Sequence, residues 1–187
     1  MTRSAPERVL VADRAVIVAG PPGYCIDQGL SRMGDGAAFV LLGSCASIEG
    51  SADTPMPRAP AILTVSVSEA AVAPLEIEVL RAYLATRDGK AALSRSGNPD
   101  SVRILETRNA EGVLYIHARD VSANVAPGMS DTYWRALFEL NGRLVTASVI
   151  GLEQRPITPD SGLETLRSLT ERLRRENARP AGAPREA

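Results

Sequence analysis

Three side chains that could do covalent or acid–base chemistry stand out because each residue type is rare in this chain. Cys25 and Cys45 are the only cysteines among the 187 residues, and His117 is the only histidine. Two cysteines can form a disulfide, exchange thiols or ligate a metal, and a histidine can act as a general base or a metal ligand. The neighbours of each residue decide between these roles.

Turn residues flank both cysteines, in Gly23-Tyr24-Cys25-Ile26-Asp27 and in Gly43-Ser44-Cys45. A disulfide would close a loop of about 20 residues, worth around 3 kcal/mol in the chain-entropy model. It would also indicate an oxidising compartment, whereas free thiols would indicate the cytosol. A redox role needs a lowered thiolate pKa, which the acidic side chain of Asp27 opposes. We expect a structural disulfide; two free, part-buried thiols and a redox or metal role are the alternatives.

His117 falls in an apolar segment, residues 113–119, which has the composition of a strand. A zinc site would require His117, both cysteines and a carboxylate to converge without the usual close ligand spacing. A Ser-His-acid triad would also have to use His117, and the sequence contains no Gly-x-Ser-x-Gly elbow. We therefore expect no catalytic residue, no metal site and no cofactor.

Four residues are the candidates for contact with a ligand or partner. His117 and Arg119 end the strand, and Asn124 lies in the long segment that follows, residues 120–131. Tyr133 comes directly after this segment, and tyrosine is a common interface anchor. Long connections often carry binding residues. A separate segment, residues 94–97 (Ser-Arg-Ser-Gly), could hold an anion, but we expect it only to end a helix.

Composition excludes several function classes. The net charge is −1 and the hydrophobic fraction is 44 %, which is enough for a full core without a broad basic face for nucleic acid. No apolar run reaches the roughly 18–20 residues of a transmembrane helix. The first ten residues lack the apolar stretch of a signal peptide, which counts against export.

Apolar periodicity and turn residues predict the order of elements. Strands are expected over residues 14–19, 38–44, 62–67, 101–107 and 113–119, and helices over residues 74–86 and 90–95. Gly89 should end the first of these helices. The polar residues before 38 and the proline-rich residues 46–60 read as connections.

The segment 133–150 predicts a β-hairpin. Asn141-Gly142 between two alternating runs is typical of a type I′ turn, which needs positive φ at both central residues. This turn pairs Leu140 with Arg143 and Trp134 with Val149. One face of the hairpin is then apolar and should be core, with Trp134, Ala136, Phe138, Val145, Ala147 and Val149.

A final amphipathic helix should begin after Thr158, a capping residue before Pro159, with Ser161 as an alternative cap one turn later. Its apolar stripe consists of Leu163, Leu166, Leu169 and Leu173. The order of strands and helices predicts an α+β fold with a mostly antiparallel sheet of about six to seven strands, packed by an interior helix and this C-terminal helix. We expect one domain over residues 13–176, between a flexible segment (1–12) and a disordered tail (177–187).

This element order resembles PsbP-like domains, the extrinsic oxygen-evolving-complex proteins of photosystem II and their bacterial relatives. Segments 23–27, 39–42, 92–97, 133–135 and 141–143 also resemble a group of uncharacterised bacterial proteins, many of which carry an export or lipoprotein leader that this N-terminus does not show. Together with the absence of catalytic motifs and with the cysteine pair, the resemblance leads us to expect a non-enzymatic domain that binds a protein partner at the bacterial cell envelope, in the periplasm or attached to it. The alternative is a cytosolic small-ligand-binding protein or enzyme with a site around His117 and Arg119.

Overall fold

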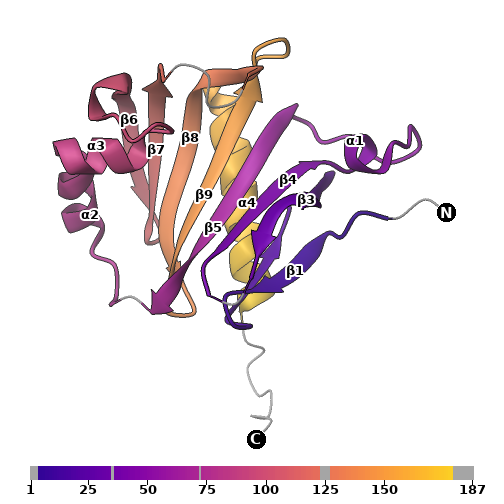
Figure 1. The fold of residues 1–187 in the computed structure, drawn as a ribbon, viewed down its shortest axis with the longest axis horizontal. Coiled ribbons are helices and arrows are strands. Elements are labelled where there is room, and N and C mark those ends of the chain that lie inside the picture. The colour runs from indigo at the N-terminus through magenta and orange to yellow at the C-terminus, as the bar shows by residue number, and fades with distance from the viewer. Residues whose placement is uncertain (1–3, 35, 72, 123–126, 179–187) are drawn as a thin grey trace, which may run out of the picture.

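A seven-stranded antiparallel sheet forms the centre of the fold in a computed structural model, which describes residues 4–34, 36–71, 73–122 and 127–178 (Figure 1). In space the strands follow the order β3-β4-β5-β9-β8-β7-β6. Their bounds are Tyr24–Met33 (β3), Ala38–Ser44 (β4), Ala61–Ala71 (β5), Val102–Ala110 (β6), Val113–Asp120 (β7), Met129–Leu140 (β8) and Arg143–Leu152 (β9). Strands β1 (Arg8–Val11) and β2 (Val16–Ala19) form a separate two-stranded sheet. The predicted α+β class is confirmed.

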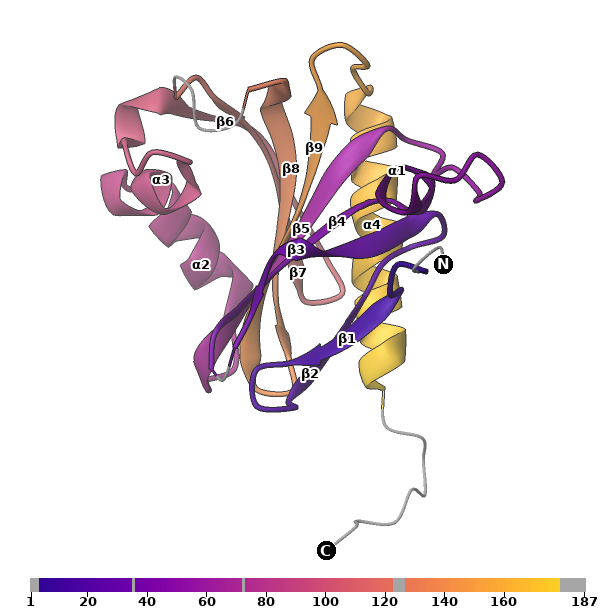
Figure 2. The ribbon, with the colours of Figure 1, turned by 45° about the vertical axis from the view of Figure 1, so that its right-hand side comes forward.

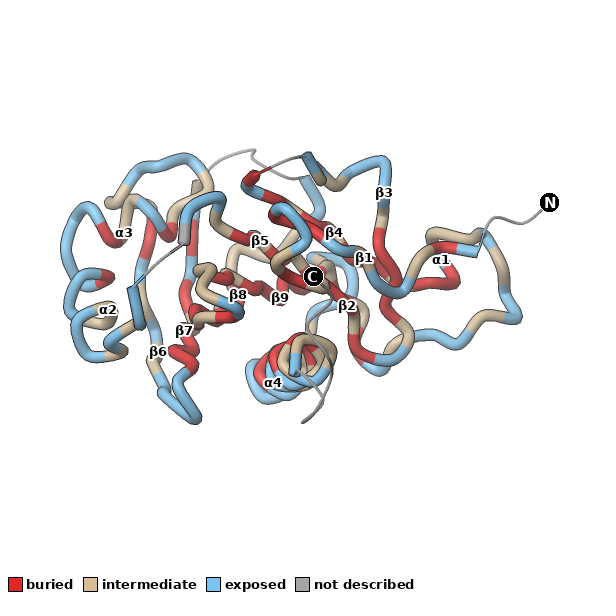
Figure 3. Tube along the Cα trace, turned by 90° about the horizontal axis from the view of Figure 1, so that it is seen from below, coloured by how far each residue is buried: buried red, intermediate tan, exposed pale blue. Residues whose placement is uncertain are grey.

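Helices pack on both faces of the large sheet (Figures 1 and 2). The longest, α4 (Pro159–Asn177), lies along one face together with β2. The short helices α2 (Ile77–Leu84) and α3 (Arg87–Leu93) pack on the other face at the β6–β7 end. Buried residues lie between the sheet and α4 and between the sheet and the two short helices (Figure 3). Helix α1 (Cys45–Glu49) follows β4, and a 3₁₀ turn over Pro99–Ser101 precedes β6.

The predicted hairpin is confirmed as β8 and β9. Leu140 pairs with Arg143, Phe138 with Val145 and Trp134 with Val149, as the Asn141-Gly142 turn requires. The six apolar side chains expected in the core are all buried, in the same core cluster as the leucines of α4. Both turn residues have positive φ, 50° at Asn141 and 74° at Gly142.

Helix α4 also begins where the sequence predicts. The Thr158 hydroxyl accepts a hydrogen bond from the Ser161 amide at 3.2 Å, so Thr158 and not Ser161 is the cap. The stripe of four leucines is buried in the same core as Val16 and Val18 of β2. This contact supplies the burial that holds an otherwise strongly charged helix in place.

The expectation of a flexible segment over residues 1–12 is wrong from Arg8 onward, because Arg8–Val11 form β1. The turn into β2 uses positive φ at Ala12, Asp13 and Arg14, which are not the glycines or prolines that signal a turn. The expected tail over 177–187 starts too early, since Asn177 ends α4 and exchanges two hydrogen bonds with the backbone of Ile17. Residues 179–187 lie outside the described residues.

Three further elements differ from the prediction. Helix α1 covers the start of the proline-rich stretch 46–60, which was expected to be a connection. Strand β3 occupies a stretch read as a connection; it is an edge strand whose polar outer residues obscure its alternation. Gly89 lies inside α3 and does not end a helix: Thr86 caps α3 by accepting from the Gly89 amide. A Cβ at Gly89 would come 2.1 Å from the carbonyl oxygen of Tyr83, so only glycine lets α3 follow α2 this closely. Among the described helices, none is long and apolar enough to cross a membrane.

Candidate functional site

The two cysteines lie at disulfide-bonding distance. Their sulfurs are 1.98 Å apart and join the start of β3 to the start of α1. Cys25 and Cys45 are both buried in a small cluster with Ala5 and Ile48. The sequence prediction of a structural disulfide agrees with this geometry. Both cysteines are buried, whereas reactive thiols are usually exposed to solvent.

Glu49, at the end of α1, ties the segments around the cysteines together. Its carboxylate accepts hydrogen bonds from the Ala5 amide at 2.8 Å and from the Thr54 hydroxyl at 2.8 Å. These bonds, led by the one from Ala5, lower the pKa of Glu49. The N-terminal segment, α1 and the following loop are therefore fixed relative to one another.

Beside the cysteines, two proline-rich loops and α4 enclose an apolar groove, which we name the Met56 groove. Its volume is about 400 Å³, and Pro21, Pro22, Pro55, Met56 and Ala59 face Thr165 and Ser168 of α4 across it. The Tyr24 hydroxyl donates to the carbonyl of Ala59, which ties one loop to the other. Burial raises the pKa of Tyr24 to about 12, so this bond keeps its proton at any physiological pH.

Close backbone contact also fixes the two loops. Gly23 has a φ of +85°, and a Cβ there would lie 2.7 Å from the nitrogen of Pro57. The Ser44 hydroxyl donates to the sulfur of Met56 at 3.4 Å. Even so, Met56 remains 58 % exposed at the mouth of the groove.

His117 lies in a second, smaller cleft between the sheet and the start of α4, which we name the His117 cleft. Its volume is about 120 Å³, and its polar lining comes from His117, Ser130, Thr132 and Thr158. The imidazole stacks on Trp134, with ring centroids 4.7 Å apart and planes inclined by 9°. No hydrogen bond joins a ring nitrogen of His117 to another described residue. Neither nitrogen is among the fully buried atoms that lack a partner, so the ring keeps some access to solvent. The imidazole can therefore bond a molecule that enters the cleft.

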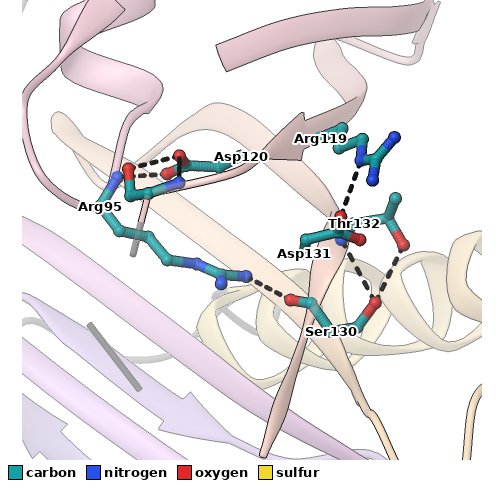
Figure 4. Close-up of polar contacts among 7 residues, drawn as sticks. Arg95, Arg119, Asp120, Ser130, Asp131 and Thr132 are labelled. Carbon is teal, nitrogen blue, oxygen red and sulfur yellow. Dashed lines mark hydrogen bonds and ion pairs between the residues drawn. The ribbon is translucent and has the colours of Figure 1, made fainter. Parts of the chain in front are cut away.

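Arg119 is not among the residues that line the His117 cleft. Its Nε donates to Asp131 at 2.7 Å (Figure 4). Ser130 and Thr132 are hydrogen-bonded through their hydroxyls at 3.1 Å. The Ser130 carbonyl accepts from the Arg95 guanidinium at 2.9 Å, so Arg95 fixes the strand that carries these two hydroxyls.

The Tyr133 side chain is buried and not the exposed contact that the sequence predicts, although Tyr133 is among the residues that line the His117 cleft. It is 2 % exposed, and its hydroxyl donates to the carbonyl of Leu93 at the end of α3. Arg135 donates to the same carbonyl and lies over the Tyr133 ring. A helix ends with unpaired carbonyls and negative partial charge, which these two side chains satisfy. Asn124, the remaining candidate, lies outside the described residues.

Sequence reasoning missed the most densely bonded polar cluster. The Asp120 carboxylate is 1 % exposed and accepts from the amide of Arg95 (Figure 4). It also accepts from the amide of Ser122. Burial would raise the pKa of Asp120, but these hydrogen bonds outweigh it and leave the pKa below its usual value. Four serine hydroxyls surround the carboxylate in one network: Ser94, Ser96, Ser101 and Ser122.

This network has a structural role. The backbone amides of Arg95 and Ser122 both donate to Asp120, so neither is available to bind an anion. Segment 94–97 follows the end of α3, as expected. An aspartate followed by a serine two residues later is a common turn signal, and it could have pointed to Asp120. The described residues contain no group of three or more side chains placed to hold a metal ion.

No protein-family model matches this sequence, and no curated protein is significantly similar to it. Function must therefore be inferred from the Met56 groove and the His117 cleft themselves.

Proposed function

We propose that this chain is a non-enzymatic, PsbP-like domain that binds a protein partner at the bacterial cell envelope, through the Met56 groove. The observation that carries the proposal is the rigid construction of an apolar surface groove. The cysteine pair, the Tyr24–Ala59 bond and the Gly23–Pro57 contact all restrain the loops that form it. Restraint of this kind lowers the entropy lost on binding.

The chemistry of the groove favours an extended peptide segment with an apolar side chain. Proline and methionine side chains give apolar walls, and methionine adapts to different partner shapes. Arg58 and Glu164 stand at the rim, with side chains 97 % and 78 % exposed. A partner backbone or polar side chain can bond these rim charges while its apolar side chain enters between Pro22 and Met56.

The cysteine pair supports the proposed compartment. A disulfide persists in the periplasm or outside the cell, whereas cytosolic thiols are kept reduced. The buried setting of Cys25 and Cys45 fits a lasting structural bond rather than a transient one. The resemblance to bacterial envelope proteins supports the same location.

Site-specific cross-linking in cells tests this proposal. A photoreactive phenylalanine analogue is placed at Met56 and, as a matched control, at Val79, an exposed apolar residue on α2. We expect one discrete adduct with an envelope protein from position 56 and none from position 79. Equal adducts from both positions, or adducts only with cytosolic proteins, would contradict the proposal.

The His117 cleft favours a second candidate function, the binding of a small ligand. The observation behind it is that His117, Ser130, Thr132 and Thr158 converge on one cleft. Arg119 belongs to this candidate only as a neighbour, since it is paired with Asp131. The two candidates use separate surfaces and can be tested separately.

A further inference from the structure

The polar groups of the His117 cleft offer both donors and acceptors. Thr158 accepts from the Ser161 amide and keeps its own hydroxyl proton free to donate. Ser130 and Thr132 share one hydrogen bond, which leaves one hydroxyl proton of the pair available. A neutral imidazole adds one donor and one acceptor at His117. A ligand hydroxyl both donates and accepts hydrogen bonds. It therefore matches the donors and acceptors of the cleft better than a group that can only donate or only accept.

Charge in the cleft is low. None of the lining residues is a lysine, arginine, aspartate or glutamate. Burial lowers the pKa of His117, against a smaller opposing effect of Glu106, so the imidazole is neutral at pH 7. A charged ligand would leave water without gaining a counter-charge, which is costly.

The nearby start of α4 does not change this balance. Pro159 has no amide proton to offer, the Ser161 amide bonds the Thr158 hydroxyl and the Gly162 amide bonds the Thr158 carbonyl. Asp160 adds a negative charge in the first turn. The positive end of the helix is therefore largely satisfied, and an anion has little to gain there.

From these groups we infer that the His117 cleft binds an uncharged ligand rich in hydroxyl groups, with a sugar residue as the biological class. The inference rests on the second candidate function. The cleft volume of about 120 Å³ is below the roughly 300–1,000 Å³ of sites for drug-sized ligands. It accommodates one edge of a sugar ring, bonded by His117, Thr158 and the Ser130–Thr132 pair, while the rest of the sugar stays in solvent.

Titration of the full chain with matched sugars tests this inference. Methyl glucoside and N-acetylglucosamine are the neutral probes, and glucose 6-phosphate and glucosamine are the charged ones. Amide chemical shifts of Thr132 and Gly162 report binding, and fluorescence of Trp134, the only tryptophan, gives a second signal. We expect saturable shifts from a neutral sugar, with an affinity at least about tenfold above that of its charged analogue.

Two variants locate the binding. His117→Phe keeps an aromatic ring next to Trp134 but removes both nitrogens. It should lower the affinity for the neutral sugar about tenfold or more. Arg119→Gln breaks only the neighbouring ion pair and should leave affinity within about twofold. Unchanged binding by His117→Phe would overturn the inference.

The remaining outcomes separate the inference from the function on which it rests. Tighter binding of glucose 6-phosphate or glucosamine at Thr132 and Gly162 would show that the ligand class is wrong while small-ligand binding stands. If no probe shifts these amides at about 100 mM, far above a millimolar dissociation constant, both the sugar inference and the second candidate function fail.

Discussion

His117 lies flat on Trp134, with ring centroids 4.7 Å apart and planes within 9° of parallel. They are the only histidine and the only tryptophan of the chain, so each reports on the other without interference. The stack forms because β7 and β8 pair directly at these two residues. The stack covers one face of the imidazole, and His117 also lines the cleft.

This stack predicts a pH-dependent tryptophan fluorescence. A protonated imidazole accepts an electron from the excited indole and quenches it, whereas a neutral imidazole quenches weakly. Because burial lowers the pKa of His117, we expect the intensity to fall on acidification with a midpoint below 6.5. His117→Gln should abolish the transition. A midpoint at or above 6.5 would mean that the ring is solvated rather than held against Trp134.

The cysteine pair predicts a large contribution to stability. Cys25→Ala together with Cys45→Ala removes the closure of about 20 residues and should lower the free energy of unfolding by around 3 kcal/mol. Urea denaturation of the oxidised protein and the double variant measures the difference. On protein from its native host, thiol alkylation should add mass only after reduction. Alkylation of both cysteines without reductant would show that they are not bonded. It would also remove the main support for an envelope location.

The close packing around Gly89 predicts that any side chain at this position destabilises the fold. A methyl group from Gly89→Ala meets the backbone of Tyr83 and Leu84 at 2.1–2.4 Å, and backbone cannot move aside cheaply. We expect a loss of unfolding free energy of about 3 kcal/mol or more, at the upper end for overpacking. Gly34→Ala is the matched control, since nothing lies within 4 Å of its added Cβ. Similar urea midpoints for the two variants would show that α2 and α3 are less closely joined.

Sequence patterns predicted the parts of the fold that depend on neighbouring residues. The Asn141-Gly142 turn determines its own strand register, and Thr158-Pro159 starts α4 through local hydrogen bonds. Strand β3 was not predicted, because pairing at the edge of the sheet depends on distant residues. The helices α2 and α3 were predicted, but Gly89 was placed at the end of the first although it lies inside the second.

The candidate site was predictable only in part, for the same reason. His117 could be named because it is unique, and the cysteines because they are a pair. The convergence of Ser130, Thr132 and Thr158 on His117 requires α4 to return to the sheet, which no local pattern encodes. Tyr133 was assigned to the surface because its burial depends on α3, an element whose position the sequence does not give.

Asp120 predicts a loss of stability in acid. Its pKa is below the usual 3.8 in the folded protein, so the unfolded chain takes up the proton first as the pH falls. The stabilisation is therefore complete above pH 3.8 and is lost as the pH falls through the lower pKa of the folded state. Asp120→Asn should remove this dependence. It should also lower the free energy of unfolding at pH 7 by about 1–3 kcal/mol, because the amides of Arg95 and Ser122 lose a charged acceptor.

Asp100→Asn is the control for this variant. Asp100 also accepts from an arginine, Arg87, but both side chains are largely exposed, and such pairs contribute between about 0 and 1 kcal/mol. Urea denaturation of both variants between pH 3 and pH 7, about the range in which carboxylates titrate, measures the contrast. Parallel curves for the two variants would show that Asp120 is solvated. In that case the serine network would not hold the end of α3 against β7, and Arg95 would not fix the strand that carries Ser130 and Thr132 in the His117 cleft.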